Sequence, residues 1–156
     1  MKGTKQGIVV LSFAILVTGL AAIGSGFSPA LAATTTTPSA PPVNLKTDNG
    51  SVGIVVDWSP KEIQQGKDTE FSINFQDPSS GALLEHVNYN LEVKDASGNT
   101  VTSLTDQHVH MGKAVQKVTF DNSGDFQLVI TVLGTGLTKP FDTAKSGTAE
   151  TSITVA

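Results

Sequence analysis

Three histidines are the residues of this chain with the clearest capacity for chemistry. His86, His108 and His110 are the only histidines, and all of them fall in one third of the sequence. Neutral imidazole is a ligand for copper, zinc and nickel. Asp106 and Met111 lie close to two of the histidines and offer a carboxylate and a thioether, and the thioether would favour Cu(I). These five side chains indicate a metal site, with copper favoured over zinc.

A β-hairpin is expected to bring the histidines together. The segment Asp95–Asn99 opens with Asp and carries Gly before its last residue, which is typical of a three-residue loop with a type I turn and a bulge. Its first and last residues then face each other, and counting outward along both strands places His86 opposite His108. This pairing predicts two imidazoles side by side.

Side-chain alternation then decides which residues share a face. Asp106, His108 and His110 occupy every second position, so they would project from one face of their strand. A two-residue loop at Ser97-Gly98 is the alternative, and it would place His108 opposite Val87 and separate it from His86. The same face carries Asn, Thr and Lys, which is typical of a solvated surface, so incidental histidines are the second interpretation.

The chain shows no arrangement of residues that indicates catalysis. It has no cysteine, which excludes disulfides, cysteine nucleophiles and a blue-copper electron-transfer centre. It contains no Gly-x-Ser-x-Gly elbow between a strand and a helix, and no His-Glu-x-x-His helix. We therefore expect that the protein is not an enzyme.

The hydrophobic pattern predicts the scaffold that must position the histidines. From Val52 onward, apolar residues recur with a period of two and turn residues interrupt them at short intervals, which is typical of an all-β fold. We expect seven strands: Val52–Trp58, Asp68–Gln76, Leu84–Lys94, Thr100–Gln107, Lys113–Phe120, Phe126–Gly134 and Thr148–Val155. Seven short antiparallel strands favour an immunoglobulin-like β-sandwich, and a barrel of similar strand number is the alternative.

Three of these strands predict the core most clearly. We expect nine of their apolar side chains to be buried: Phe71, Ile73, Phe75, Tyr89, Leu91, Val93, Phe126, Leu128 and Ile130. The Cys, Trp, Cys signature of true immunoglobulin domains is absent, so the core must be stable without a disulfide.

The N-terminal residues 1–32 are typical of a secretory signal peptide. Lys2 and Lys5 form a positive segment, 8–23 is an apolar stretch, and Ala30-Leu31-Ala32 is a small-residue cleavage site before Ala33. An uncleaved membrane anchor is the alternative, but an apolar stretch of this length is short for a bilayer span of ~20 residues. We expect an extracytoplasmic protein.

Residues 33–42 are rich in Thr and Pro and are expected to form a linker, followed by the β-sandwich domain at 43–156. The whole chain has 10 Lys and no Arg against 14 Asp plus Glu, and its formal net charge is -4. Binding to nucleic acid requires clustered positive charge along the phosphates, so this balance argues against a nucleic-acid partner.

Part of the sequence resembles small exported sandwich modules of the YtkA-like, FixH-like and CopC-like type. The residues that carry the resemblance are Trp58-Ser59-Pro60-Lys61-Glu62-Ile63, Gly66, Phe71–Asp77, Tyr89–Asp95, a turn at Gly98, a His-bearing segment at His108–Gly112, and Phe120–Leu128. The likeness spans Val52–Gly134. It implies copper handling or the assembly of respiratory complexes, although the CopC-like pattern has a His at the mature N-terminus, where this chain has Ala33-Thr34.

Two functions therefore follow as hypotheses. The first is an exported, non-catalytic binding module that captures or delivers copper through the histidine cluster. The second is a structural or interaction module, or an accessory subunit of an envelope or membrane complex, in which the histidines are incidental and loops or edge strands carry the function.

Overall fold

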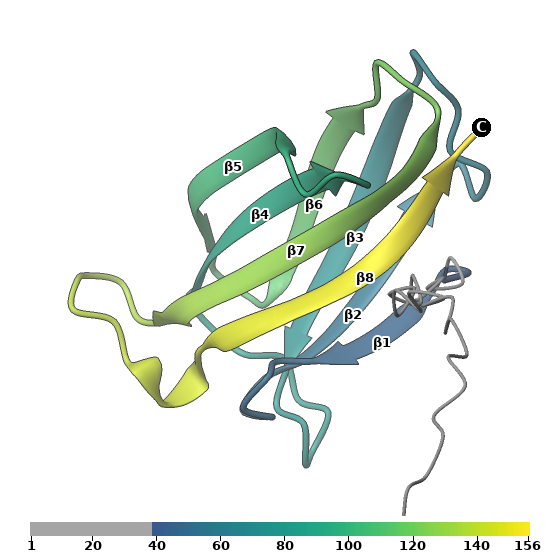
Figure 1. Ribbon diagram of the computed structural model, residues 1–156. Helices are drawn as coiled ribbons and strands as arrows, with labels where there is room; N and C mark the ends of the chain where they lie inside the picture. The colour runs from purple at the N-terminus through teal and green to yellow at the C-terminus, as the bar shows by residue number, and fades with distance from the viewer. Residues whose placement is uncertain (1–38) are drawn as a thin grey trace, which may run out of the picture. The chain divides into compact units, whose positions relative to one another are not determined.

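The computed structural model describes residues 39–156, which form a β-sandwich of two antiparallel four-stranded sheets (Figure 1). The first sheet has the order β1 (Val43–Lys46), β2 (Gly53–Ser59), β3 (Asp68–Gln76) and β6 (Lys113–Thr119). The second has the order β5 (Thr100–Val109), β4 (Val87–Asp95), β7 (Gly124–Thr135) and β8 (Gly147–Val155). A single 3-10 turn, η1 (Thr143–Lys145), precedes β8. Within residues 39–156, no helix is long and apolar enough to cross a membrane.

The core lies between the inner faces of the two sheets, as side-chain alternation predicts. Phe75 on β3 and Tyr89 on β4 are fully buried, and their rings pack across the two sheets with centroids 4.9 Å apart. The Tyr89 hydroxyl accepts a hydrogen bond of 2.8 Å from Gln116 Nε2, because a buried phenol needs a polar partner. All nine predicted core residues are buried: Phe71, Ile73, Phe75, Tyr89, Leu91, Val93, Phe126, Leu128 and Ile130.

The predicted all-β sandwich is confirmed, and the strands pair in two separate sheets rather than in a barrel. Eight strands are present where seven are predicted, because β1 was not expected. This strand has only four residues, and its two apolar side chains, Val43 and Leu45, are half-buried. A pattern of two apolar residues directly after Pro41-Pro42 is too short to predict a strand. β3 has the predicted bounds, and the other strand ends either match the predicted ones or differ from them by one to three residues.

Residues 39–42, the described part of the expected linker, contact the domain. The Ser39 amide donates a hydrogen bond of 3.1 Å to the Ser152 carbonyl, and Thr151 Oγ1 donates one of 3.1 Å to Ser39 Oγ. The expected signal peptide and residues 33–38 lie outside the described residues. The sandwich therefore includes contacts from at least one residue, Ser39, that precedes the predicted start of the domain at Val43.

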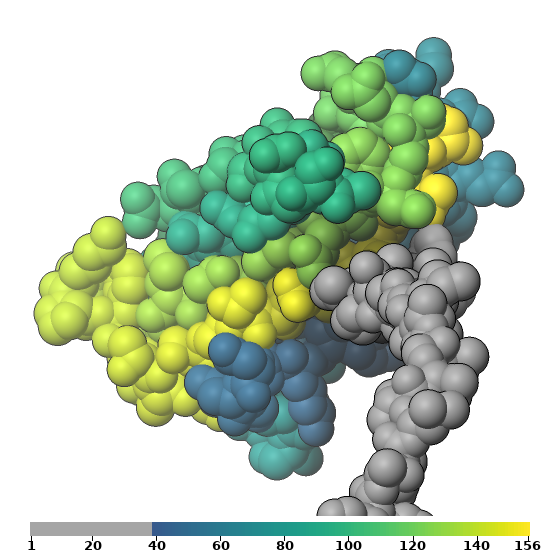
Figure 2. All heavy atoms as spheres, in the orientation of Figure 1, coloured from purple at the N-terminus to yellow at the C-terminus, as the bar shows by residue number. Residues whose placement is uncertain are grey.

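Three connections meet at one end of the sandwich: the β3–β4 loop, the β5–β6 turn and the β7–β8 connection. The Phe75 amide donates to the Gly112 carbonyl at 2.8 Å, which joins β3 to the β5–β6 turn. The Gly136 amide donates to the His86 carbonyl at 2.9 Å, which joins the β7–β8 connection to the end of the β3–β4 loop. Figure 2 shows the β7–β8 connection, in yellow-green, projecting at the left of the view.

An ion pair links the β3–β4 loop to η1. Lys145 Nζ lies 2.7 Å from Asp77 Oδ2, and both side chains are half-buried. The Asp77 carboxylate also accepts hydrogen bonds from the Ser79 and Ser80 amides at 3.0 and 3.1 Å. Lys145, together with the Ser79 and Ser80 donors, holds the pKa of the Asp77 carboxyl well below its usual range.

The inter-sheet aromatic contact predicts a large cost for truncating Phe75. Phe75→Ala should lower the free energy of unfolding by about 3–5 kcal/mol, because it removes a fully buried ring and leaves a cavity. Val115→Ala, at a side chain 59% exposed, should change it by less than about 0.5 kcal/mol. Urea unfolding of both variants measures the difference. Equal losses would contradict the assignment of Phe75 to the core.

The lowered pKa of Asp77 predicts a pH-dependent contribution to stability. A free aspartate titrates near pH ~3.9, so a folded pKa below that value stabilises the fold above about pH 4, and the stabilisation is lost as the pH falls further. Asp77→Asn retains a side-chain oxygen for the amide donors but loses the charge. The wild type should be more stable than Asp77→Asn at pH 7 and pH 5, with a smaller difference at pH 3. A difference that does not change with pH would contradict this role of the carboxylate.

Candidate metal centre

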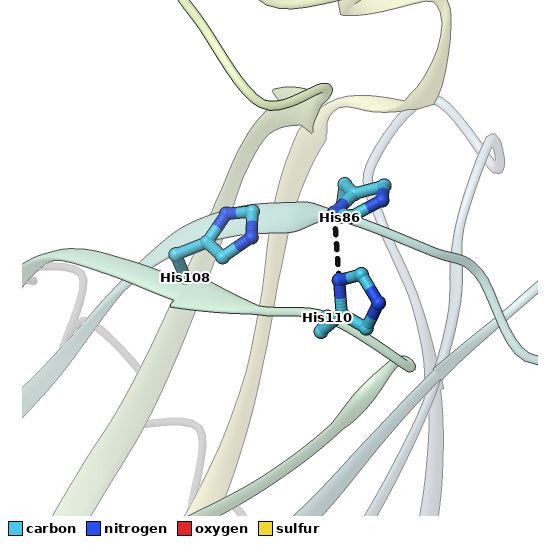
Figure 3. Close-up of side chains that lie close together, drawn as sticks. All are labelled: His86, His108 and His110. Carbon is cyan, nitrogen blue, oxygen red and sulfur yellow. Dashed lines mark hydrogen bonds between the residues drawn. The ribbon is translucent and has the colours of Figure 1, made fainter.

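Three imidazoles converge where β4 begins and β5 ends (Figure 3). One donor atom from each of His86, His108 and His110 can be chosen so that all lie within 4.8 Å of one another. The Nδ1 atoms of His86 and His110 are 3.1 Å apart, and their rings meet edge to face with centroids 4.3 Å apart. The His108 ring stacks beside His86 at 5.7 Å. His86 is half-buried, and the other two are exposed.

The register of β5 against β4 differs from the predicted one. Lys94 faces Thr100, as the turn at Asp95–Asn99 predicts, but the register then shifts by one residue at each of two bulges. As a result, His108 faces Asn88, and the His86 amide donates to the His110 carbonyl at 3.0 Å. The predicted pairing of His86 with His108 is therefore wrong.

The alternative pairing of His108 with Val87 is also wrong, since Val87 faces Val109. A shift of one residue turns a strand's side chains to the opposite face, and a shift of two restores them. The two bulges together therefore keep all three histidines on the outer face, while the partner of His86 changes from His108 to His110.

The second bulge has a side-chain contact that accounts for its position. The Asp106 amide donates a hydrogen bond of 2.9 Å to Asn90 Oδ1, and Asp106 has a φ of 52°. Asp is one of the few residues that adopt this left-handed conformation readily. The carboxylate of Asp106 lies 3.3 Å from Lys139 Nζ and does not belong to the group of converging donors. Asp106 thus shapes the strand next to the cluster, and the structure does not bring it into the ligand set.

Met111 follows His110 in the β5–β6 turn, and its side chain is 66% exposed. Of the four predicted site residues with nitrogen or carboxylate donors, the structure brings together the three histidines and leaves out Asp106.

The backbone at His86 is held in an uncommon conformation. Its φ is 51°, a value that few residues other than glycine adopt. Both of its backbone polar groups are used, because the amide donates to the His110 carbonyl and the carbonyl accepts from the Gly136 amide. The β5–β6 turn and the β7–β8 connection therefore hold His86 from two sides. This local geometry was not predicted, because Leu84–Lys94 was expected to be one continuous strand.

Asn88 is a member of the site that the sequence analysis did not select. It is 7% exposed, and its Oδ1 lies 2.9 Å from His108 Nδ1. The sequence contained one indication of this role: Asn88 lies two residues after His86, so alternation places both side chains on the outer face of the expected strand. The predicted register placed it opposite Asp106, so its contact with His108 could not be foreseen.

The cluster has the separations that a nitrogen-coordinated ion requires. Zinc lies at about 2.0–2.1 Å from imidazole nitrogen, so two such ligands of one ion are about 3.0–3.4 Å apart. The 3.1 Å between the Nδ1 atoms of His86 and His110 falls within this range. A ring nitrogen of His108 lies within 4.8 Å of a ring nitrogen of each of the other two histidines. The three imidazoles are therefore the candidate ligands of a nitrogen-coordinated metal site.

A comparison of the chain with models of protein families and with curated proteins found no match.

The close approach at Gly112 predicts that the β5–β6 turn tolerates no side chain there. A Cβ on Gly112, whose φ is +64°, would lie 2.5 Å from the Leu84 carbonyl oxygen and 2.8 Å from that of Phe75. Gly66 is the matched control, because its φ is +72° and nothing lies within 4 Å of a Cβ placed there. Gly66→Ala should cost about 1–2 kcal/mol for the backbone conformation alone.

Gly112→Ala should cost about a further 1–3 kcal/mol, because the surrounding backbone must move. It should also shift the NMR signals of the His110 ring, which lies two residues away. Chemical unfolding and a histidine side-chain spectrum measure the two effects. Equal costs for Gly112→Ala and Gly66→Ala would contradict the close approach.

Proposed function

We propose that this protein is an exported, non-catalytic β-sandwich module that binds copper, or delivers it, through His86, His108 and His110. The observation that carries the proposal is the convergence of three imidazole donors within 4.8 Å at one end of the β4–β5 hairpin. The backbone hydrogen bond between His86 and His110 and the paired strands hold two of the donors near ligand separation before an ion arrives. Such preorganisation lowers the entropic cost of binding.

The donor chemistry favours copper over the other divalent ions. Affinity for nitrogen donors generally rises along the first-row series to Cu²⁺ and falls at Zn²⁺. The chain has no cysteine that could supply a thiolate and so favour zinc or Cu(I). The remaining candidate soft ligand is Met111, which follows His110 in the chain and has an exposed side chain.

Delivery is supported by the exposure of the cluster. His108 and His110 are exposed, and the Asp106 carboxylate is paired with Lys139. Donor atoms of a partner protein could therefore reach a bound ion from solvent. The signal-like segment 1–32 and the resemblance to YtkA-like, FixH-like and CopC-like modules favour an extracytoplasmic location and a partner in an envelope or membrane complex.

A metal titration tests this function. At pH 7.5 the wild-type protein should bind one Cu²⁺ per chain, and Zn²⁺ more weakly. The variant His108→Ala/His110→Ala should lose this binding, since one imidazole remains. Thr100→Ala/Ser103→Ala, with two exposed substitutions elsewhere on β5, is the matched control and should bind as the wild type does. Binding is read by isothermal titration calorimetry and by Cu²⁺ electron paramagnetic resonance.

The same titration at pH 5.5 provides a second comparison. A free imidazole is protonated near pH ~6.5, and a protonated ring cannot bind metal, so wild-type affinity should fall steeply between the two pH values. The double variant should have little pH-dependent binding to lose. If the wild type and the double variant bound copper equally at pH 7.5, the metal site would be wrong and the interaction-module interpretation would replace it.

A further inference from the structure

We propose that Asn88 is a positioning residue that holds His108 in the tautomer with its proton on Nδ1 and so leaves Nε2 as the metal-binding atom. The role in metal binding rests on the proposed function, whereas the tautomer is a property of the metal-free protein. The inference deepens the site, because it names the donor atom and the group that selects it.

The Asn88 side chain is fixed by the backbone around it. Its Nδ2 atom lies 2.9 Å from the Gly136 carbonyl oxygen, 3.2 Å from that of His86 and 3.5 Å from that of Gly134. The side chain belongs to one of the few buried polar residues among 39–156. A buried amide of this kind is stabilised only if its donors and acceptor are used.

These contacts determine which way the amide points. Only the NH₂ group can donate to carbonyl oxygens, so a flipped amide would place Oδ1 against the carbonyls of Gly136 and His86. The unflipped amide directs Oδ1 at His108 Nδ1, at a distance of 2.9 Å. The orientation thus follows from three backbone acceptors and not from His108 itself.

The amide orientation then determines the tautomer of His108. A carbonyl oxygen accepts and cannot donate, so the hydrogen bond requires a proton on His108 Nδ1. In the neutral ring the lone pair is then on Nε2, which faces away from Asn88. Metal-binding histidines are generally oriented in this way, with one ring nitrogen donating to a second group and the other bound to the ion.

The other two histidines use a different ring atom. The Nδ1 atoms of His86 and His110 lie 3.1 Å apart, so one of them donates its proton to the other. An ion bound between them would need both Nδ1 lone pairs, so the ring that donates would then carry its proton on Nε2 instead. The donor set is therefore Nδ1 of His86, Nδ1 of His110 and Nε2 of His108. Asn88 selects the third of these atoms, because it keeps the proton of His108 on Nδ1.

Asn88 also joins the site to the β7–β8 connection. The carbonyls of Gly134 and Gly136 that orient the amide belong to the end of β7 and the residues after it. The orientation of His108 thus depends on backbone more than 25 residues from it in sequence. A substitution at Asn88 would release the imidazole without removing any ligand.

The first experiment is a long-range ¹⁵N–¹H correlation spectrum of the histidine rings in metal-free wild-type protein at pH 8. His108 should show a protonated Nδ1 and an unprotonated Nε2. In Asn88→Ala the same ring should change toward the Nε2-protonated form that free imidazole side chains prefer. Thr151→Val, a buried polar position on β8 of the same sheet, is the matched control and should leave the His108 signals unchanged.

The second experiment is a double-mutant cycle on Cu²⁺ affinity. Asn88→Ala should raise the dissociation constant about 10- to 100-fold in the wild-type background, as is usual for the group that orients a ligand. In the His108→Ala background, the same substitution should change it less than about twofold, because Asn88 acts through His108. A merely structural role would weaken binding equally in both backgrounds.

The outcomes separate this inference from the proposed function. An Nε2-protonated His108 in the wild type, or equal losses in both backgrounds, would overturn the role of Asn88 even if copper binds. Absence of copper binding by the wild type would overturn the proposed function, and the metal-free spectrum would still decide the tautomer. Because that spectrum needs no substitution, an Asn88→Ala protein that fails to fold does not prevent the test.

Discussion

The register of β5 against β4 is the constraint on which the candidate site depends. Each of the two bulges taken alone would turn the outer side chains of β5 beyond it toward the core. Together they move β5 by two residues, so that His108 faces Asn88 and His110 lies beside His86. The pair of bulges thus creates two contacts at once: the Nδ1 to Nδ1 contact between His86 and His110, and the contact between the Asn88 amide and the third ring. A regular hairpin would have placed His86 against His108 and left Asn88 opposite Asp106.

The strands alone do not complete the arrangement, because His86 lies before the first residue of β4. Its left-handed backbone is held by hydrogen bonds to the β5–β6 turn and from the β7–β8 connection. A hydrogen bond between Phe75 and Gly112 holds this β5–β6 turn against β3. The backbones approach so closely there that no Cβ fits on Gly112. Strain of this kind persists only where surrounding structure determines the conformation. The site is therefore a property of three connections meeting on a rigid sandwich.

The sequence predicted those parts of the structure that depend on local pattern. Alternation identified the core residues of β3, β4 and β7, and the turn at Asp95–Asn99 forms with the Asp95 amide bonded to the Asn99 carbonyl and Gly98 at a φ of +84°. The bulges were beyond such reasoning, since the second one depends on a hydrogen bond between Asn90 and the backbone sixteen residues later. The role of Asn88 was beyond it for the same reason: its partners are backbone carbonyls at Gly134 and Gly136, which only the assembled sheet brings to it.

The two faces of β4 separate the stability of the fold from the chemistry of the site. Val87, Tyr89 and Leu91 bury their side chains completely in the core, whereas the imidazoles lie on the outer face and add little to it. Removing an exposed imidazole should therefore cost little stability, because exposed side chains make few contacts to lose. Asn88 is the exception, since it is buried on the outer face beneath the β7–β8 connection and satisfies backbone carbonyls there. The Asn88 side chain therefore contributes both to stability and to the site: its Nδ2 atom donates to backbone carbonyls of the fold, and its Oδ1 atom contacts His108.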